Sequence, residues 1–153
     1  MIESNREIKK PSEKREIMPR FEASALRGYC VSVLTASGVE RSCAEAVADA
    51  LIDAELTGVS THGVSRLAVY MQRMDAGVMS RENNIRIVRE STSTLVVDAG
   101  NSLGAAAAKF AMERCIAKAK ETGCCFASVH SSNHFGTAAY YTRLAAAQDM
   151  IGF

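Results

Sequence analysis

The chain has 153 residues, of which 48% are hydrophobic and 23% charged, a balance typical of a soluble globular protein with one core. Its 18 basic and 17 acidic residues nearly cancel, which argues against nucleic acid or an anionic membrane as the main partner. No apolar stretch of the sequence is long enough to span a bilayer, and the first residues lack the apolar core of a secretion signal. We therefore expect a cytoplasmic protein whose partners are small molecules or other subunits.

The number and spacing of the cysteines also favour a cytoplasmic protein. The five cysteines are odd in number, and no pair has the C-x-x-C spacing of a zinc site or redox motif. The sequence predicts reduced, mostly buried thiols and no disulfide framework. These residues are Cys30, Cys43, Cys115, Cys124 and Cys125.

Residues 1–20 carry six basic and four acidic side chains and offer almost nothing to bury. The segment is predicted to be a flexible extension. A mitochondrial presequence is the alternative for a basic start, but such peptides are poor in acidic residues.

Helical periodicity begins at Phe21 and ends at Gly38, since glycine accepts the left-handed conformation common after a helix. Ser42–Glu45 has the pattern of a capping box and is expected to open a second helix that ends near Gly58. A third helix is predicted around 67–74.

Two short β-branched runs, 85–88 and 94–98, predict strands of a hairpin. An alanine-rich helix follows over 103–122, then a strand over 124–129 that reads as buried on both faces, and a helix over 137–148. The Gly100–Gly104 turn is expected to be a tight connection with Ser102 near the helix cap. Its alternative, an anion site at the helix start, lacks the G-x-G-x-x-G spacing of a dinucleotide turn.

The last four residues, Met150–Phe153, have the character of the first half of another buried strand. A complete domain rarely ends at such a point. The sequence therefore predicts that the chain is part of a longer enzyme.

Two of the three histidines lie in segments rich in glycine and hydrogen-bonding residues, Thr61–Arg66 and Ser131–Gly136. Histidine is the side chain whose unperturbed pKa lies near neutrality. Both segments are therefore candidates for proton transfer.

In the first segment, His62 and Arg66 are four residues apart and would share a side of a helix that begins at about Gly63. The guanidinium can grip a substrate carboxylate by two hydrogen bonds while the imidazole moves a proton. Thr61 can orient the imidazole ring. The alternative is a His62 that caps the helix and an Arg66 that is a solvated surface charge.

In the second segment, His134 can take a hydroxyl proton, Asn133 can orient a substrate or cofactor amide, and Gly136 lets a ligand approach the backbone. The alternative is a loop histidine satisfied by neighbouring serines. His130 and His134 are also four apart, but residue 131 is serine where the metalloprotease motif has glutamate. We expect no metal site.

The two histidine segments and several others resemble those of a known family. Residues 56–67 (LTGVSTHGVSRL), with Tyr70 and Gly77 after them, closely resemble the N-terminal signature of the malate/L-lactate dehydrogenase family that is unrelated to the Rossmann-fold lactate and malate dehydrogenases. Further segments match that family in order and spacing over residues 21–153. They are Val97–Gly100, Leu103–Gly104, Ala119–Gly123, Ser132–Gly136 and Met150–Gly152.

The resemblance implies an oxidoreductase that transfers a hydride between a nicotinamide cofactor, NAD or NADP, and a 2-hydroxy or 2-keto acid, usually as a homodimer. His62 matches a histidine proposed as proton donor in some members, and His134 one proposed as acceptor in others. Arg66 matches the arginine of the first motif and would hold the substrate carboxylate, with Asn133 as a second substrate contact. Thr61 replaces the serine most common before that histidine.

The implied fold is α/β but not Rossmann: N-terminal helices followed by the start of a mixed sheet flanked by helices, an incomplete version of the sulfolactate dehydrogenase-like fold. Residues 21–153 would be the N-terminal portion of such an enzyme. Most of the cofactor site is expected beyond residue 153, with Gly136 the one contact in this stretch. The alternative is an inactive fragment that serves as an interaction module for a homologous subunit.

Overall fold

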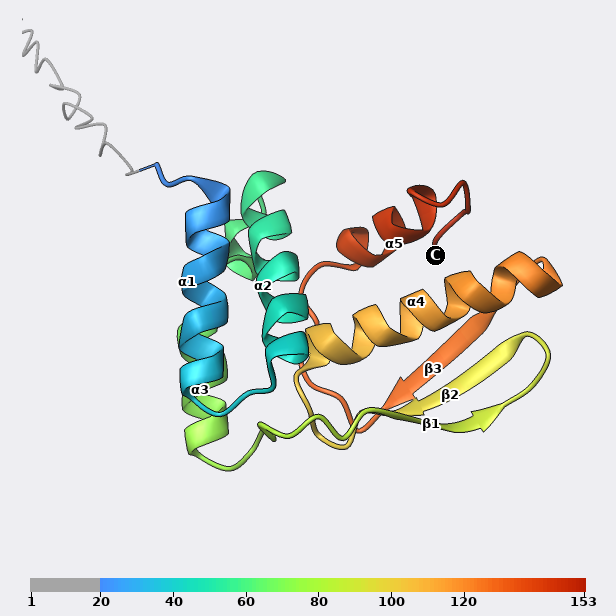
Figure 1. Cartoon of the computed structure of the whole chain (residues 1–153), viewed down its shortest axis with the longest axis horizontal. Coiled ribbons are helices and arrows are strands. Elements are labelled where there is room, and N and C mark those ends of the chain that lie inside the picture. Colours follow the sequence, from blue (N-terminus) through green and yellow to red (C-terminus); the bar gives the residue numbers. More distant parts are fainter. Residues whose placement is uncertain (1–19) are drawn as a thin grey trace, which may run out of the picture.

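The computed structural model describes residues 20–153 (Figure 1). The predicted extension over 1–20 lies outside the described residues except for its last residue, so it stays a prediction. Three helices come first, then a β-hairpin, a long helix, a third strand and a last helix. This is the mixed α/β architecture that the resemblance implies. Within residues 20–153, no helix combines the length and the apolar character needed to cross a membrane.

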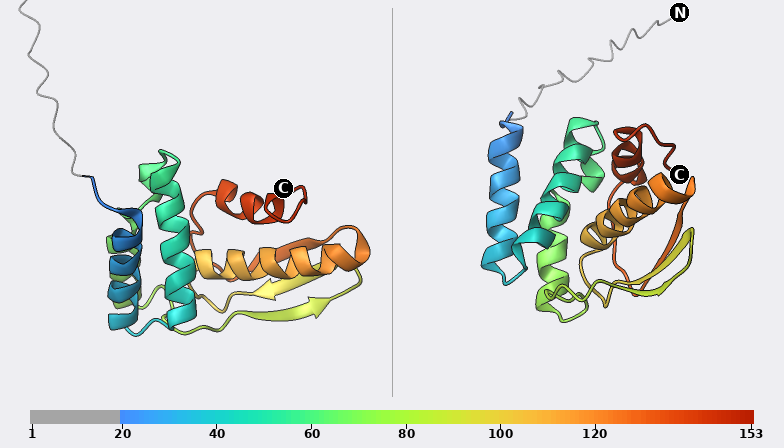
Figure 2. Two further views of the ribbon diagram at one scale, coloured as in Figure 1. Left: turned by 45° about the horizontal axis from the view of Figure 1, so that its top comes forward. Right: turned by 45° about the vertical axis from the view of Figure 1, so that its right-hand side comes forward.

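The first three helices are α1 (Ala23–Ala36), α2 (Arg41–Leu56) and α3 (Arg66–Asp75). Helices α1 and α2 lie side by side (Figures 1 and 2), and all three helices contribute to one apolar core. Burial of a large aliphatic side chain stabilises a fold by about 1.5–3 kcal/mol, so this cluster anchors the helical part. Its most buried members include Leu34, Val47, Leu51, Leu67 and Met74.

The sheet has three strands in the order β1 (Arg86–Glu90), β2 (Thr94–Asp98) and β3 (Phe126–His130). β1 and β2 form the predicted antiparallel hairpin, whereas β3 runs parallel to β2 with His130 opposite Asp98. Because β2 and β3 are parallel, their carboxyl ends lie at the same edge of the sheet. The second histidine segment follows β3 at that edge.

Helix α4 (Gly104–Thr122) makes the crossover that a parallel strand pair requires, and it covers one face of the sheet (Figure 2). It ends at Gly123, whose φ of 84° is the left-handed conformation predicted for that stop. Helix α5 (Ala138–Ala146) packs on α4 and buries Tyr140 and Tyr141. Both helices fall within the predicted ranges.

The third strand is less buried than its sequence predicts. Phe126 is 70% exposed and Cys124 is exposed as well, so the expectation of burial on both faces is wrong. β3 lies at the edge of the sheet, and no described residue covers the face opposite α4. The expected strand at 150–153 is also wrong, because these residues are irregular and Ile151 is almost fully exposed.

All five cysteines are free thiols in the structure. Only Cys30 and Cys43 are buried, because they lie on the core faces of α1 and α2. Cys115 and Cys125 are half-buried. The expectation that most of the cysteines are buried is therefore wrong.

Two serines that were predicted near helix starts form hydrogen bonds with other partners instead of capping the helices. α2 begins at Arg41, and the Ser42 hydroxyl donates to the Glu40 carboxylate at 2.5 Å, so the expected capping box is wrong. Ser102 does not cap α4 either. Its buried hydroxyl donates to the Glu82 carbonyl at 2.8 Å and accepts the Asn84 N–H at 3.1 Å, which ties the start of the hairpin to the start of α4.

Replacing Ser102 by alanine removes both bonds and leaves a backbone carbonyl and an N–H without partners. We expect Ser102→Ala to lower the free energy of unfolding by about 1–3 kcal/mol, measured by urea denaturation. Ser32→Ala is the matched control, because its exposed hydroxyl donates only within α1, and it should change stability by less than about 0.5 kcal/mol. Equal effects of the two changes would contradict the assigned role.

Candidate active site

The two histidine segments meet in space. His62 ends a 3-10 turn, η1 (Ser60–His62), between α2 and α3, and His134 lies in the loop after β3. Their rings stack with centroids 5.3 Å apart and planes inclined by 29°. Two imidazoles from distant parts of the sequence are thus brought to one place.

The first segment is held by Glu55 of α2. One oxygen of this carboxylate accepts the Val64 N–H at 2.8 Å, and a Cβ added to Gly63 would lie 2.0 Å from the same oxygen. Glycine is therefore required for the close approach. Thr61 Oγ1 lies 3.0 Å from His62 Nδ1, which is the contact that the predicted ring-orienting role needs.

The second segment is held against the start of α4. Asn133 Nδ2 donates to the carbonyls of Asn101 and Ser102, each at 3.0 Å. A Cβ added to Gly104 would lie 2.1 Å from the Asn133 carbonyl oxygen, so only glycine permits this contact. The amide N–H groups of Asn133 are thus used within the protein. Its side-chain oxygen, 3.4 Å from Nη2 of Arg73, is the atom left for a ligand.

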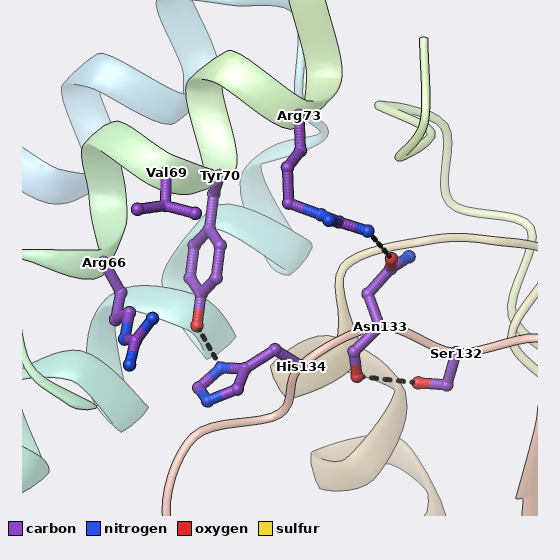
Figure 3. A pocket seen from close by; sticks show the side chains of 7 residues that line it. All are labelled: Arg66, Val69, Tyr70, Arg73, Ser132, Asn133 and His134. Atoms are coloured by element: carbon purple, nitrogen blue, oxygen red, sulfur yellow. Dashed lines mark hydrogen bonds between the residues drawn. The ribbon is translucent and has the colours of Figure 1, made fainter. Parts of the chain in front are cut away.

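Hydrogen bonding defines the tautomer of His134. Nδ1 lies 2.9 Å from the Tyr70 hydroxyl and accepts the Gly136 N–H at 3.3 Å. Because a backbone N–H can only donate, Nδ1 is an acceptor and the neutral ring carries its proton on Nε2. The ring projects from the loop toward Arg66 and Tyr70 (Figure 3).

Burial and nearby charges keep the His134 and Tyr70 side chains uncharged near neutral pH. Burial, followed by the positive charge of Arg66 and the neighbouring His62, lowers the pKa of His134. Burial also raises the pKa of Tyr70, so its hydroxyl keeps its proton and donates to Nδ1. The neutral imidazole therefore presents an Nε2–H donor.

Arg66 lies at the site, but the helical spacing that was expected to place it there is wrong. Helix α3 begins at Arg66 rather than near Gly63, so His62 and Arg66 do not share a helical face. Instead Arg66 Nε donates to the Thr61 carbonyl at 2.7 Å, because the chain folds back over the first turn of α3. This bond fixes the side chain and leaves both Nη groups available for a ligand.

An open cleft of about 410 Å³ lies between α3 and the loop after β3 (Figure 3). None of its lining side chains is acidic, and two are arginines. A cleft lined by one sign of charge attracts a ligand of the opposite sign. The lining residues are Arg66, Val69, Tyr70, Arg73, Ser132, Asn133 and His134.

Gly136 has a φ of 86°, a left-handed conformation that favours glycine, and no atom lies within 4 Å of a Cβ built on it. The backbone there is open, and its role as a cofactor contact stays a prediction. His130 is directed elsewhere, with Nδ1 3.0 Å from the Ser131 hydroxyl. Among residues 20–153, no group of three or more metal-ligating side chains gathers.

Sequence reasoning gave no site role to four of the residues that line the cleft, and Tyr70 and Arg73 are the two with the most chemistry to offer. Tyr70 was expected in the third helix and as part of the family signature but was given no site role, although a buried tyrosine usually needs a partner for its hydroxyl. Arg66, Tyr70 and Arg73 are spaced as i, i+4 and i+7. That spacing places them on one face of α3 and was the available signal.

A family model described as malate/L-lactate dehydrogenase matches residues 21–153. The chain belongs to this family. It is 40% identical over 136 residues to an L-sulfolactate dehydrogenase of Methanothermobacter thermautotrophicus, a match that covers 89% of this chain and 39% of the relative.

Solved structures of the family agree with this assignment. The malate dehydrogenase from Pyrococcus horikoshii matches with a TM-score of 0.82 and 37% identity, covering 85% of this chain and 37% of that one. The sulfolactate dehydrogenase from Methanocaldococcus jannaschii gives 0.81 and 36%, covering 84% and 37%. The resemblance and the incomplete, non-Rossmann fold are confirmed, and the chain spans well under half the length of these family members.

The turn before α4 forms no cradle for the phosphates of a dinucleotide. A Cβ on Gly100 would lie 2.4 Å from the Asn84 side chain, and Gly104 is covered by the Asn133 carbonyl. Protein atoms therefore occupy the start of α4, where an anion would need accessible N–H groups. The turn therefore serves as a structural connection between β2 and α4.

Removing the positive charge of Arg66 should raise the pKa of His134, because that charge lowers it. We expect Arg66→Met to move the His134 titration upward in an NMR pH series, although burial still holds it below the unperturbed value of about 6.5. The lowered pKa means that the folded chain binds the proton less readily than the unfolded chain. Stability therefore declines as the pH falls below about 6.5.

Arg89→Met is the control for this titration, because Arg89 is an exposed arginine on β1, away from the cleft. It changes the net charge by the same amount and should leave the His134 titration unchanged. An equal shift in both variants would contradict a local effect of Arg66.

Proposed function

We propose that this chain is the acid-binding and proton-transfer part of an NAD(P)-dependent oxidoreductase that interconverts 2-hydroxy acids and 2-keto acids. One observation carries the proposal: His134 lines a cationic cleft together with Arg66, and the imidazole of His62 stacks on the ring of His134. Family membership supports dehydrogenase chemistry in general. Relatives are named for malate and sulfolactate, both 2-hydroxy acids.

Arg66 holds the carboxylate next to the reacting carbon. Its Nε is fixed on the Thr61 carbonyl, so the guanidinium is already oriented before a ligand arrives. The remaining N–H groups can make two parallel bonds to one carboxylate. A substrate held in this way brings its C2 oxygen toward the two imidazoles.

We assign different chemical roles to the two histidines. His134 has Nδ1 fixed as an acceptor and offers Nε2–H, which can donate a hydrogen bond to the C2 oxygen of the substrate. Among the described residues, the His62 ring hydrogen-bonds only to the Thr61 hydroxyl, which can either donate or accept, so neither tautomer of this ring is fixed. We therefore assign proton transfer to His62, oriented by Thr61, and polarisation of the C2 oxygen to His134.

The cofactor is NAD or NADP, whose nicotinamide exchanges a hydride with C2 of the acid in this class of reaction. The turn before α4 provides no phosphate cradle, and no step of the hydride transfer is assigned to residues 20–153. Gly136, with its open backbone beside His134, is the one position that we assign to the cofactor side. Asn133 is assigned to the substrate side through its side-chain oxygen.

A homodimer and a cytoplasmic location stay predictions that depend on the resemblance. The alternative of an inactive interaction module is not favoured, because the family match runs through both histidine segments. These segments also converge on one cationic cleft.

The activity itself can be assayed with the 153-residue chain, alone and together with the remaining part of a family member added as a separate polypeptide. We expect oxidation of NADH or NADPH with a panel of 2-keto acids in the complemented form. Absence of turnover with every acid and both cofactors, in both forms, would overturn the proposal.

The roles of the histidines can be separated by kinetics in that active form. His62→Asn should lower kcat by about a hundredfold or more and remove one ionisation from the pH–rate profile, since the proton-transfer group is lost. His134→Asn should lower kcat but keep that ionisation. His130→Asn is the matched control outside the cleft and should leave kcat unchanged. Retention of the ionisation in His62→Asn would contradict the assignment.

A further inference from the structure

Helix α3 carries a second cation on the face that lines the cleft. Arg73 follows Arg66 by seven residues, which is close to two full turns, so both project from the same side of the helix about 10.5 Å apart along its axis. Both side chains line the cleft and both lie on the same wall of it (Figure 3). In the proposed function Arg66 holds the substrate carboxylate, and Arg73 has no role.

Neither arginine is neutralised by the part of the chain that the structure describes. Ion pairs engage seven other arginines and lysines there, but neither Arg66 nor Arg73 is among them. Arg73 is exposed, and its one hydrogen bond goes to the Asn133 side-chain oxygen at a long 3.4 Å. Because a guanidinium carries five donors, Arg73 keeps most of its binding capacity.

Val69 and Tyr70 of the same helix separate the two cations (Figure 3). Val69 lies on the same face of α3, three residues after Arg66 and four before Arg73, and lines the cleft between them (Figure 3). Its side chain is 38% exposed and can pack against a short carbon chain. Along the helix the cleft thus presents a cation, a partly apolar wall formed by Val69 and Tyr70, and a second cation, which complements a molecule with an anionic group at each end.

We propose that Arg73 is a specificity-determining residue that binds the second anionic group, a carboxylate or a sulfonate, of a dianionic 2-hydroxy acid. This inference rests on the proposed function, in which Arg66 holds the carboxylate next to C2. His134 lies near the Arg66 end of the cleft, so the reacting carbon lies there and the distal group reaches toward Arg73. A monoanionic acid such as lactate leaves Arg73 unused.

Binding of three acids to the 153-residue chain tests the assignment. L-malate and sulfolactate carry the second anionic group, and L-lactate lacks it. Affinities can be measured by titration calorimetry at low salt and by following the imidazole protons of His134. We expect Arg73→Met to weaken binding of malate and sulfolactate by about tenfold or more and to leave lactate within about twofold.

Two further variants make the result specific. Arg73→Lys keeps the charge but loses the planar fork, and it should weaken malate binding less than Arg73→Met does. Arg89→Met removes an exposed positive charge on β1 and is the control for the change in net charge. It should change the affinity for malate and for lactate by no more than about twofold. A role limited to the Asn133 contact would weaken malate and lactate equally, and that result would overturn the inference.

Different results would contradict the assignment of Arg73 and the proposed function. If both classes of acid bind the unaltered chain and Arg73→Met changes neither, the assignment of Arg73 is wrong and the proposed function stands. If none of the acids binds the unaltered chain, the proposed function fails and this inference fails with it. If Arg73→Met weakens the binding of malate but not that of sulfolactate, the carboxylate is the group that Arg73 binds.

Discussion

The site depends on one close contact, between the loop after β3 and the first residue of α4. Gly104 lets the carbonyl of Asn133 approach to a distance that any side chain would block, and the Asn133 amide adds two hydrogen bonds to the same turn. This contact fixes where the loop leaves the sheet. It thereby brings His134 to Tyr70 and against the ring of His62.

The second organising feature is electrostatic. The cleft gathers two arginines and excludes acidic side chains from its lining, so its positive charge is left for a ligand to neutralise. The same charge, together with burial, favours the neutral form of His134. A preoriented cation and a neutral hydrogen-bond donor are useful together, because one binds a carboxylate while the other stabilises charge that develops on a neighbouring oxygen.

Local patterns predicted much of the fold. The helices α1 and α4, the hairpin and the glycine stops at Gly38 and Gly123 depend on periodicity and backbone freedom within a few residues, and such signals are contained in the sequence itself. The burial of β3 was predicted wrongly, because apolar side chains in a strand do not reveal what covers them. The serine caps failed for a related reason, since Ser42 and Ser102 found competing partners.

The sequence alone determined the residue types of the chemistry, the two histidine segments with Arg66 and the family to which they point. It could not determine that the histidines stack, because that proximity depends on the parallel pairing of β2 and β3 and on the packing of the following loop on α4. Nor could it show that Tyr70 and Arg73 belong to the cleft. Helical spacing puts them on one face, but only tertiary packing decides which part of the protein that face meets.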